Sequence, residues 1–339
     1  MSRNIAEALE ADTTTVAAIP GFQSLIDTYR AYAAVAEAAQ AWNTESVNAK
    51  IDEHIAIFAD STPDADAVKA LQDELSNMMK SSITDKVASE DNPLDITAFL
   101  ANPSFTNDSY AGWTVANGTP GNYYSECEFY NTNFNIYQIV SGLPAGFYRF
   151  AVQGFYRDGS CETAYTNATT LDEETGEPSN VLNAKLYANE MQSDIQSWAD
   201  FKLKGEQFNG YWSPNATDES IEAEDVLYFA NTMEAANILF DQKNLNVDGN
   251  TVDFYLDGTQ DAKLGIRKDT TISADWTIFD NFHLYYLGQD TPTGIEQVSE
   301  SIASRSTLHA SRYTLSGQRV SIITRPGIYI VNGKKVIVK

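Results

Sequence analysis

The spacing of hydrophobic residues changes near residue 90, and this change constrains the fold more than any other feature of the sequence. Up to about residue 88, apolar residues recur every three or four positions, which is the period of a helix. From about residue 93, short alternating runs are separated by Gly, Asn, Asp and Pro, as in antiparallel strands. The sequence therefore predicts a multidomain α+β protein whose first part is helical and whose centre is β.

The helical part, residues 1–90, contains three apolar stripes. They are Phe22, Leu25, Ile26, Tyr29, Tyr32, Ala33 and Ala36; Val47, Ile51, Ile55 and Phe58; and Val68, Leu71, Leu75, Met78 and Met79. Short connections between three amphipathic helices predict an antiparallel bundle. We expect Asn43 to cap the second helix and Pro63 to begin the third. His54 precedes Ile55, so we expect Ile55 in the core and His54 at its boundary.

The central part, residues 91–287, is expected to form an antiparallel β-sandwich. The clearest strands are 136–140, 146–156, 182–188, 251–256, 262–267 and 276–287. Short helices are expected near 190–201 and 218–237, and the stretch 160–180 is expected to be a polar loop. If the turn Leu143–Gly146 joins two paired strands, Cys127 lies close enough to Cys161 for a disulfide. Two buried free thiols are the alternative.

The C-terminal residues differ in charge from the rest of the chain. Residues 305–339 contain seven Lys or Arg and no Asp or Glu, whereas residues 1–304 contain the other 15 basic residues and all 47 acidic ones, +7 against −32. Alternating apolar residues predict a small β-module, with a hairpin at Asn332-Gly333. Residues 288–304, rich in Ser, Thr and Gly without an apolar period, are expected to be a linker.

The net charge of −25 argues against nucleic acid or an anionic membrane as a partner. The sequence contains no apolar run long enough for a transmembrane segment. The first residues, MSRNIAEALEAD, lack the apolar core of a signal peptide. An exported form would therefore have lost its signal peptide, or these residues would be foreign to the natural chain.

The C-terminal module resembles the sorting domain of proteins exported by the type IX (Por) secretion system of Bacteroidetes. The matching segments are 313–320 (YTLSGQRV), 326–331 (PGIYIV) and 333–336 (GKKV). The resemblance implies export machinery as a partner of residues 305–339 and an extracellular or outer-membrane location. An ordinary terminal β-module is the alternative.

The centre resembles the galactose-binding-like jelly roll of many carbohydrate-binding modules. The matching segments are 100–105 (LANPSF), 111–113 (AGW), 143–149 (LPAGFYR), 153–157 (QGFYR) and 275–284 (DWTIFDNFHL). The resemblance implies that the first and last segments lie side by side. We expect the aromatic residues of these segments to be core: Trp113, Phe155, Trp276, Phe279 and Phe282.

The same resemblance implies a structural calcium ion as the one expected cofactor. Related jelly rolls hold calcium with an acidic residue near the last strand and the loop of the first strand. The corresponding oxygen donors are Asn102, Asn107, Asp108 and Asp280. Such modules carry a Glu after the entry Phe, and this chain has Thr106 at that position. The alternative to a calcium site is that Asp280 caps a turn or pairs with a neighbouring Arg.

No catalytic motif stands out. HExxH, CxxC and P-loop patterns are absent, and the three histidines are dispersed. Glycan binding needs only an aromatic ring for the apolar face of a sugar and polar groups for its hydroxyls. We expect these contacts, in order of preference, from Tyr211 and Trp212, then Tyr123 and Tyr124, then Trp198, together with Arg157 at the end of a strand. Packing of the aromatic residues into the core and a structural salt bridge of Arg157 are the alternatives.

The sequence thus predicts a non-catalytic secreted or cell-surface protein that binds a glycan or surface ligand. One alternative is a structural or protein–protein adhesion component without a sugar site. The other is a glycoside hydrolase with an unrecognised carboxylate pair.

Overall fold

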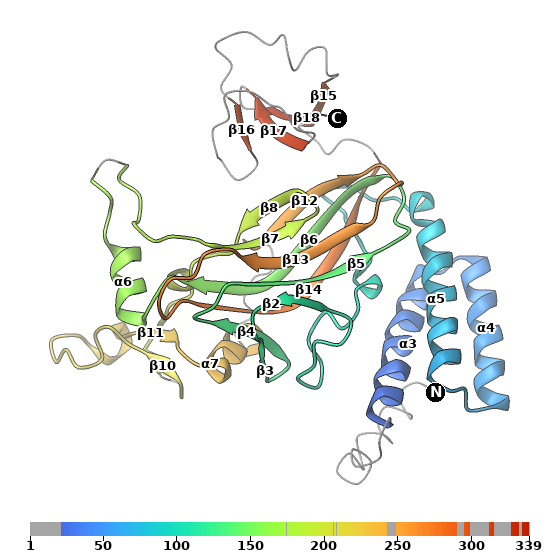
Figure 1. Cartoon of the computed structure of the whole chain (residues 1–339), viewed down its shortest axis with the longest axis horizontal. Helices are drawn as coiled ribbons and strands as arrows, with labels where there is room; N and C mark the ends of the chain where they lie inside the picture. Colours follow the sequence, from blue (N-terminus) through green and yellow to red (C-terminus); the bar gives the residue numbers. More distant parts are fainter. Residues whose placement is uncertain are drawn as a thin grey trace. The chain divides into compact units, whose positions relative to one another are not determined.

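The computed structural model describes residues 22–173, 175–205, 207, 209–242, 249–289, 295–298, 312–314, 327–331 and 334–338. It combines helices with antiparallel sheets (Figure 1). Residues 1–87 with 142–144 group into one compact unit, and the remaining residues into a second. The start of the chain and most of the expected linker lie outside the described residues, and the proposed domain boundaries stay predictions.

Three helices account for the predicted stripes: α3 (Phe22–Trp42), α4 (Glu45–Asp60) and α5 (Ala65–Ser81). The cap of the second helix lies one residue later than expected, and the third helix begins at Ala65, two residues after Pro63. Thr44, not Asn43, accepts a hydrogen bond from the Val47 amide, and Asp64 accepts one from the Ala67 amide. A side-chain oxygen must face the first free amides of the helix, and Asn43 instead adopts a left-handed turn with φ 51°.

The boundary assignment on α4 was reversed. His54 is completely buried, whereas Ile55 is 49% exposed. Val47, Ile51 and His54 lie on one face of the helix, at positions i, i+4 and i+7. The imidazole is accommodated there because it lies 3.2 Å from the Tyr32 hydroxyl and 3.2 Å from a Glu74 oxygen.

Two antiparallel sheets form the centre of the second unit (Figure 1). The six-stranded sheet has the order β12 (Thr251–Leu256), β6 (Gly146–Arg157), β14 (Trp276–Gly288), β4 (Glu126–Tyr130) and β3 (Gly121–Tyr123), with β1 (Leu94–Asp95) also paired to β14. The five-stranded sheet has the order β2 (Thr114–Asn117), β5 (Phe134–Val140), β13 (Ala262–Lys268), β7 (Ala184–Ala188) and β8 (Met191–Asp194). All six predicted strands are present.

Aromatic side chains fill the space between the two sheets. Phe129 of β4 stacks on Phe134 of β5 with ring centroids 4.0 Å apart, and both rings lie near Phe279. The five aromatic residues expected in the core are all at most 7% exposed. The entry and exit segments lie side by side, since the Phe282 amide donates to the Pro103 carbonyl at 2.9 Å.

The strands flanking Leu143–Gly146 are not paired with each other, contrary to the sequence interpretation. β5 pairs with β2 and β13, whereas β6 pairs with β12 and β14 in the other sheet. Adjacent strands along a chain can pair or cross between sheets, and the local pattern does not distinguish the two. Cys127 and Cys161 are consequently two buried free thiols, not a disulfide.

A second hydrophobic cluster covers part of the outer face of the six-stranded sheet. Phe155, Trp276 and Ile278 of the sheet pack against residues between 161 and 240. This segment contains α6 (Cys161–Thr169), η3 (Trp198–Asp200), β9 (Leu203–Lys204), β10 (Tyr211–Trp212), η4 (Ala223–Asp225), β11 (Leu227–Ala230), α7 (Met233–Asn237) and the π-helical turn η5 (Ile238–Gln242). The helix α6 corrects the expected loop 160–180, and Ser160 caps it by accepting from the Thr163 amide.

The C-terminal strands form a four-stranded sheet in the order β15 (Ile295–Val298), β18 (Lys334–Val338), β17 (Gly327–Val331) and β16 (Arg312–Thr314). The antiparallel pairing of β17 with β18 confirms the predicted hairpin strands. The linker prediction was wrong at β15, which pairs in parallel with β18. A short strand with little alternation is stabilised here by backbone hydrogen bonds to a neighbour that the local sequence does not reveal. None of the described helices is long and apolar enough to cross a membrane.

Candidate functional site

The hairpin of β3 and β4 presents two exposed aromatic residues. Tyr123 is 64% exposed and Tyr124 is 52% exposed. Tyr124 and Ser125 form the two-residue connection, and both have left-handed backbones with φ 58° and 56°. Such turns usually carry Asn or Gly, because a side chain is strained there. Strain held at an exposed turn is typical of functional positions, so this hairpin is the strongest candidate for a binding site.

Two segments distant in the sequence hold the strained turn. The Ser125 amide donates to Asp108 Oδ1 at 2.8 Å, and Asn237 Nδ2 of α7 donates to the Tyr124 carbonyl at 3.2 Å. Asp108 lies in a loop that also has a left-handed Asn107, with φ 61°. Three of the residues singled out from the sequence, Tyr123, Tyr124 and Asp108, are therefore brought together.

Two buried carboxyl groups lie beside the hairpin. Glu126, the cross-strand partner of Tyr123, is completely buried, and Asp280 on the adjacent strand β14 is 7% exposed. Neither oxygen of Glu126 has a hydrogen-bond partner among the described residues, and Asp280 Oδ1 has none either. Burial, with a smaller contribution from Asp280 and other carboxylates, raises the pKa of Glu126 to about 10. Burial is also the main cause that raises the pKa of Asp280 to about 7.

The backbone around Asp280 is irregular. β14 has a bulge between Asp280 and His283, and Asn281 within it has φ 57°. Asn281 is fixed by Ser104 and Gln153, and Gln153 also donates to the Phe240 carbonyl of η5 at 3.4 Å. Bulges and π-helical turns both occur often next to functional sites. The exposed hairpin, the bulge and η5 therefore define one candidate region.

The loop pair preferred from the sequence is not an exposed platform. Tyr211 and Trp212 are partly buried in the short strand β10. The Tyr211 hydroxyl donates to the Ala235 carbonyl, and the Trp212 ring packs 5.7 Å from Tyr165 and 6.0 Å from Trp198. Trp198 itself is only 1% exposed, so it has no free ring face for a sugar. Tyr211, Trp212 and Trp198 therefore pack in an aromatic cluster. The flanking Gly and Pro residues predict a loop but do not indicate this packing.

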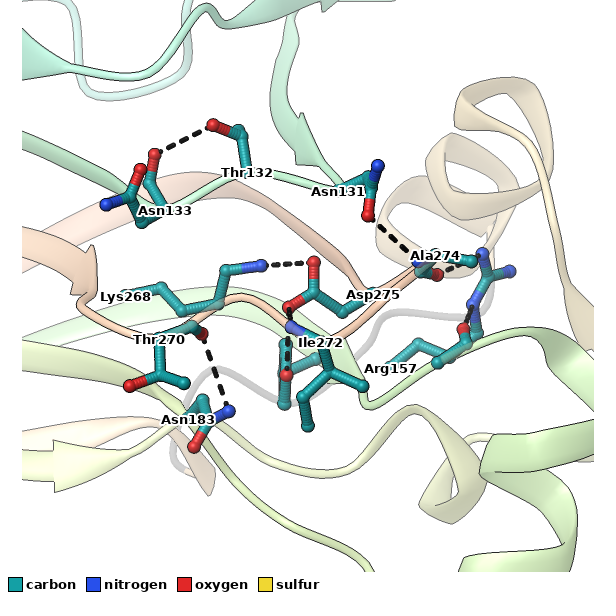
Figure 2. Close-up of polar contacts among 12 residues, drawn as sticks. Asn131, Thr132, Asn133, Arg157, Asn183, Lys268, Thr270, Ile272, Ala274 and Asp275 are labelled. Carbon is teal, nitrogen blue, oxygen red and sulfur yellow. Dashed lines mark hydrogen bonds and ion pairs between the residues drawn. The ribbon is translucent and has the colours of Figure 1, made fainter.

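Arg157 is a structural residue of the interior. It is 5% exposed, and its guanidinium lies 5.2 Å from the Trp276 ring and 5.9 Å from the Trp198 ring. It donates to Asn231 Oδ1 at 2.6 Å and to the Gly159 carbonyl. It also donates to the Ala274 carbonyl at 3.4 Å (Figure 2). These bonds join the end of β6 to the segment before α6, to the residue after β11 and to the β13–β14 loop. Burial and these bonds direct the guanidinium away from any surface ligand, contrary to the sequence prediction.

Two of the four oxygen donors expected for calcium, Asn102 and Asp108, hold turns with their side chains. Asn102 uses its amide within its own loop, donating to the Ser109 carbonyl and accepting from the Thr106 amide. Asp108 Oδ1 is occupied by the Ser125 amide. Within the described part of the chain, no three His, Cys, Asp or Glu side chains are grouped so as to hold a metal ion. The residue beside Asp280 is Glu126 on the paired strand β4. Sequence analysis missed Glu126, because no local motif marks it.

No protein-family model matches the sequence, and no curated protein does. Among solved structures, the chain is similar to TmCBM61, described as in complex with β-1,4-galactotriose. The alignment covers 56% of this chain and 97% of that one, with 11% identity and a TM-score of 0.22. A likeness at this level carries no argument about function, which therefore depends on the geometry above.

Proposed function

We propose that the protein is a non-catalytic secreted or cell-surface protein that binds glycans through the β3–β4 hairpin. The observation that carries this proposal is the exposed pair Tyr123–Tyr124 on a strained turn held by Asp108 and Asn237. Tyrosine rings pack against the apolar faces of pyranoses, and a turn fixed before binding loses little entropy when the ligand arrives.

The polar groups around the hairpin suit sugar hydroxyls. Asp108 accepts at only one of its oxygens in the described contacts, and Tyr110, two residues further on, is 46% exposed. Carboxylate, amide and phenol groups beside an aromatic surface are the usual complement for a polyhydroxylated ligand.

The buried carboxyl pair supports binding rather than hydrolysis. A glycosidase acid must reach the glycosidic oxygen, and its partner must reach the anomeric carbon or a water. Glu126 has no exposed surface and Asp280 is 7% exposed, so neither is presented to a bound sugar.

We further propose a jelly-roll topology for the sandwich, a bundle for α3–α5, and an export role for residues 305–339.

A glycan array on the full chain tests the proposal. We expect binding to neutral or acidic oligosaccharides that falls at least tenfold in Tyr123→Ala and Tyr124→Ala. Tyr130→Ala is the matched control, because Tyr130 lies at the end of β4 away from the turn and is 55% exposed. Equal losses in all three variants would refute the hairpin as the site. Absence of any glycan binding would refute the function and favour a protein-binding adhesion component.

A further inference from the structure

The outer face of the five-stranded sheet is basic in a chain whose first 304 residues carry a net charge of −32. Leu264 and Ile266 of β13 are completely buried, so the alternating residues Lys263, Gly265 and Arg267 point to the other face. The three central strands β5, β13 and β7 contain no Asp or Glu. This face therefore attracts negatively charged groups that the acidic body otherwise repels.

Gly265 lies in one row with two tyrosines. Tyr137 of β5 and Tyr187 of β7 are its direct partners on the neighbouring strands. A Cβ at Gly265 would collide with the backbone of β5, which keeps this position free of a side chain. Lys263 and Arg267 lie two residues to either side, about 13 Å apart along an extended strand. The row thus has an open centre and a positive side chain at each end.

Both cations lie over tyrosine rings. The Lys263 ammonium is 4.0 Å from the centroid of the Tyr137 ring, and within the described part of the chain it forms no ion pair or hydrogen bond. The Arg267 guanidinium is 5.4 Å from the Tyr187 ring and donates to Gln192 Oε1 at 2.8 Å. Its Nε has no hydrogen-bond partner among the described residues. Donor groups for a carboxylate therefore remain available.

Acidic groups reach only the margin of this face. Asp194 of the edge strand β8 pairs with Lys185. Asp269, which follows β13, lies 3.9 Å from Arg267 Nε, and its side chain is 80% exposed. An ion pair that is so exposed contributes little, so Asp269 competes weakly with an incoming carboxylate.

The chemistry of the face suits an acidic peptide better than a sugar. The amide oxygens of Asn135 and Gln192 already accept hydrogen bonds from side chains of this face, and Tyr187 is only 4% exposed. A sugar needs an open ring face and free acceptors for its hydroxyls, whereas a carboxylate needs donors alone. Ile139, the cross-strand partner of Lys263, is 57% exposed and offers an apolar contact to a side chain of a protein partner.

We propose that this face, formed by Tyr137, Ile139, Lys263, Gly265 and Arg267, docks an extended acidic segment of a partner protein. Carboxylates at positions i and i+4 of an extended segment are about 13 Å apart, as Lys263 and Arg267 are, and residue i+2 then lies over Gly265. Recognition of acidic motifs by basic side chains is a common mode of peptide binding. The β3–β4 hairpin belongs to the other sheet, so this docking does not depend on glycan binding there.

Fluorescence anisotropy with the full chain and a labelled peptide, Ser-Glu-Ser-Val-Ser-Glu-Ser, tests the proposal. The peptide places two carboxylates at the required spacing with an apolar residue between them. We expect a dissociation constant on the order of 100 µM at about 50 mM NaCl, weakened about fivefold at about 300 mM NaCl. The same peptide with Gln in place of both Glu residues should not bind. Equal binding of the two peptides, or no binding of either, would overturn the proposal.

Substitutions on the face locate the binding. Lys263→Gln and Arg267→Gln should each weaken peptide binding about fivefold. Lys204→Gln, at an exposed pair with Asp225, is the matched control and should bind as the wild type does. Lys263→Gln decides the outcome if Arg267→Gln folds poorly, because the Lys263 ammonium has no polar partner in the described residues. Unchanged affinity in Lys263→Gln would overturn the proposal. Polygalacturonate binding that Lys263→Gln abolishes, without peptide binding, would replace it with an acidic-glycan site.

Discussion

Lys268 and Asp275 form an ion pair in which both side chains are completely buried (Figure 2). Asp275 also accepts hydrogen bonds from the Tyr156 hydroxyl at 3.2 Å and from the Ile272 amide at 2.8 Å. The pair closes the loop between β13 and β14 and fixes the start of the strand that carries Asp280. Asp280 lies five residues beyond Asp275, so the geometry of the candidate site depends on a contact at the start of β14.

Removing one member of this pair is expected to be costly. Lys268→Met leaves the Asp275 carboxylate buried without its cation, which we expect to lower the free energy of unfolding by about 3 to 5 kcal/mol. Urea unfolding at pH 7 measures the change. Lys69→Met, which breaks an exposed pair with Asp73, should change it by at most about 0.5 kcal/mol. Similar small effects in both variants would contradict a stabilising role for the buried pair.

Replacing Arg157 by lysine is expected to destabilise the protein although the charge is kept. A lysine cannot donate simultaneously to Asn231, Gly159 and Ala274, nor stack between two indole rings. We expect the free energy of unfolding, measured by chemical denaturation, to fall by about 2 kcal/mol. Arg30→Lys, at an exposed contact with Asp27, is the control and should be neutral. If Arg157→Lys is equally neutral, the buried contacts do not carry the energy assigned to them.

At the strained Tyr124–Ser125 turn, we expect a substitution that raises the free energy of unfolding to lower the affinity for glycans. Replacing Tyr124-Ser125 by Asn-Gly supplies residues that tolerate left-handed backbones, so we expect a gain of about 1 kcal/mol in unfolding free energy. The backbone donor to Asp108 is retained. Glycan affinity should nevertheless fall, because one exposed ring is lost. A less stable double variant would show that the turn is not strained.

Trp212 should matter for stability and not for glycan binding. Trp212→Ala removes packing against Tyr165, Trp198 and Phe229. We expect the free energy of unfolding to fall by about 2 to 4 kcal/mol. The folded variant should bind glycans as the wild type does, measured below its unfolding temperature. Selective loss of binding at unchanged stability would return the site to the loop preferred from the sequence.

Alkaline pH should weaken the five-stranded sheet through Tyr187. Burial raises the pKa of its phenol to about 12, while Arg267 and the hydrogen bond to Asn135 act in the opposite direction. The folded state then holds a proton that the unfolded state releases near pH 10. The stability linked to this proton is complete below pH 10 and is lost as pH rises toward 12.

Comparing unfolding free energies at pH 9 and 11 measures this contribution. We expect about 1 kcal/mol of the decrease to disappear in Tyr187→Phe. The variant should be less stable than the wild type at pH 9, because it lacks the 2.8 Å hydrogen bond to Asn135. An identical pH slope in both proteins would exclude Tyr187 as the titrating group.

Local patterns predicted the elements and much of the core. The periods of three to four and of two residues located α3–α5 and the long strands, and the aromatic residues of 275–284 were correctly placed in the interior. The errors lie where a partner distant in sequence decides the outcome. His54 is buried because Tyr32 and Glu74 offer polar partners, and Trp212 is half-buried because Tyr165 and Trp198 lie beside it.

The candidate site shows the same limit. Tyr123, Tyr124, Asp108 and Asp280 could be selected as chemically suitable residues, but Glu126 carries no motif. Its importance arises from the pairing of β4 with β14, which buries it next to Asp280 without a donor.

The amino-acid sequence by itself determined where the chain is helical and where it is extended, because side-chain periodicity and turn residues act between near neighbours. It also determined the acidic charge of the body and the basic charge of the C-terminal strands. Only the tertiary structure decided that β5 and β6 belong to different sheets, which aromatic residues stay exposed, and that Glu126 faces Asp280. Those outcomes depend on pairing between strands that are far apart in the sequence. Many strand registers satisfy the local hydrophobic pattern, and side-chain packing in the folded protein selects one of them.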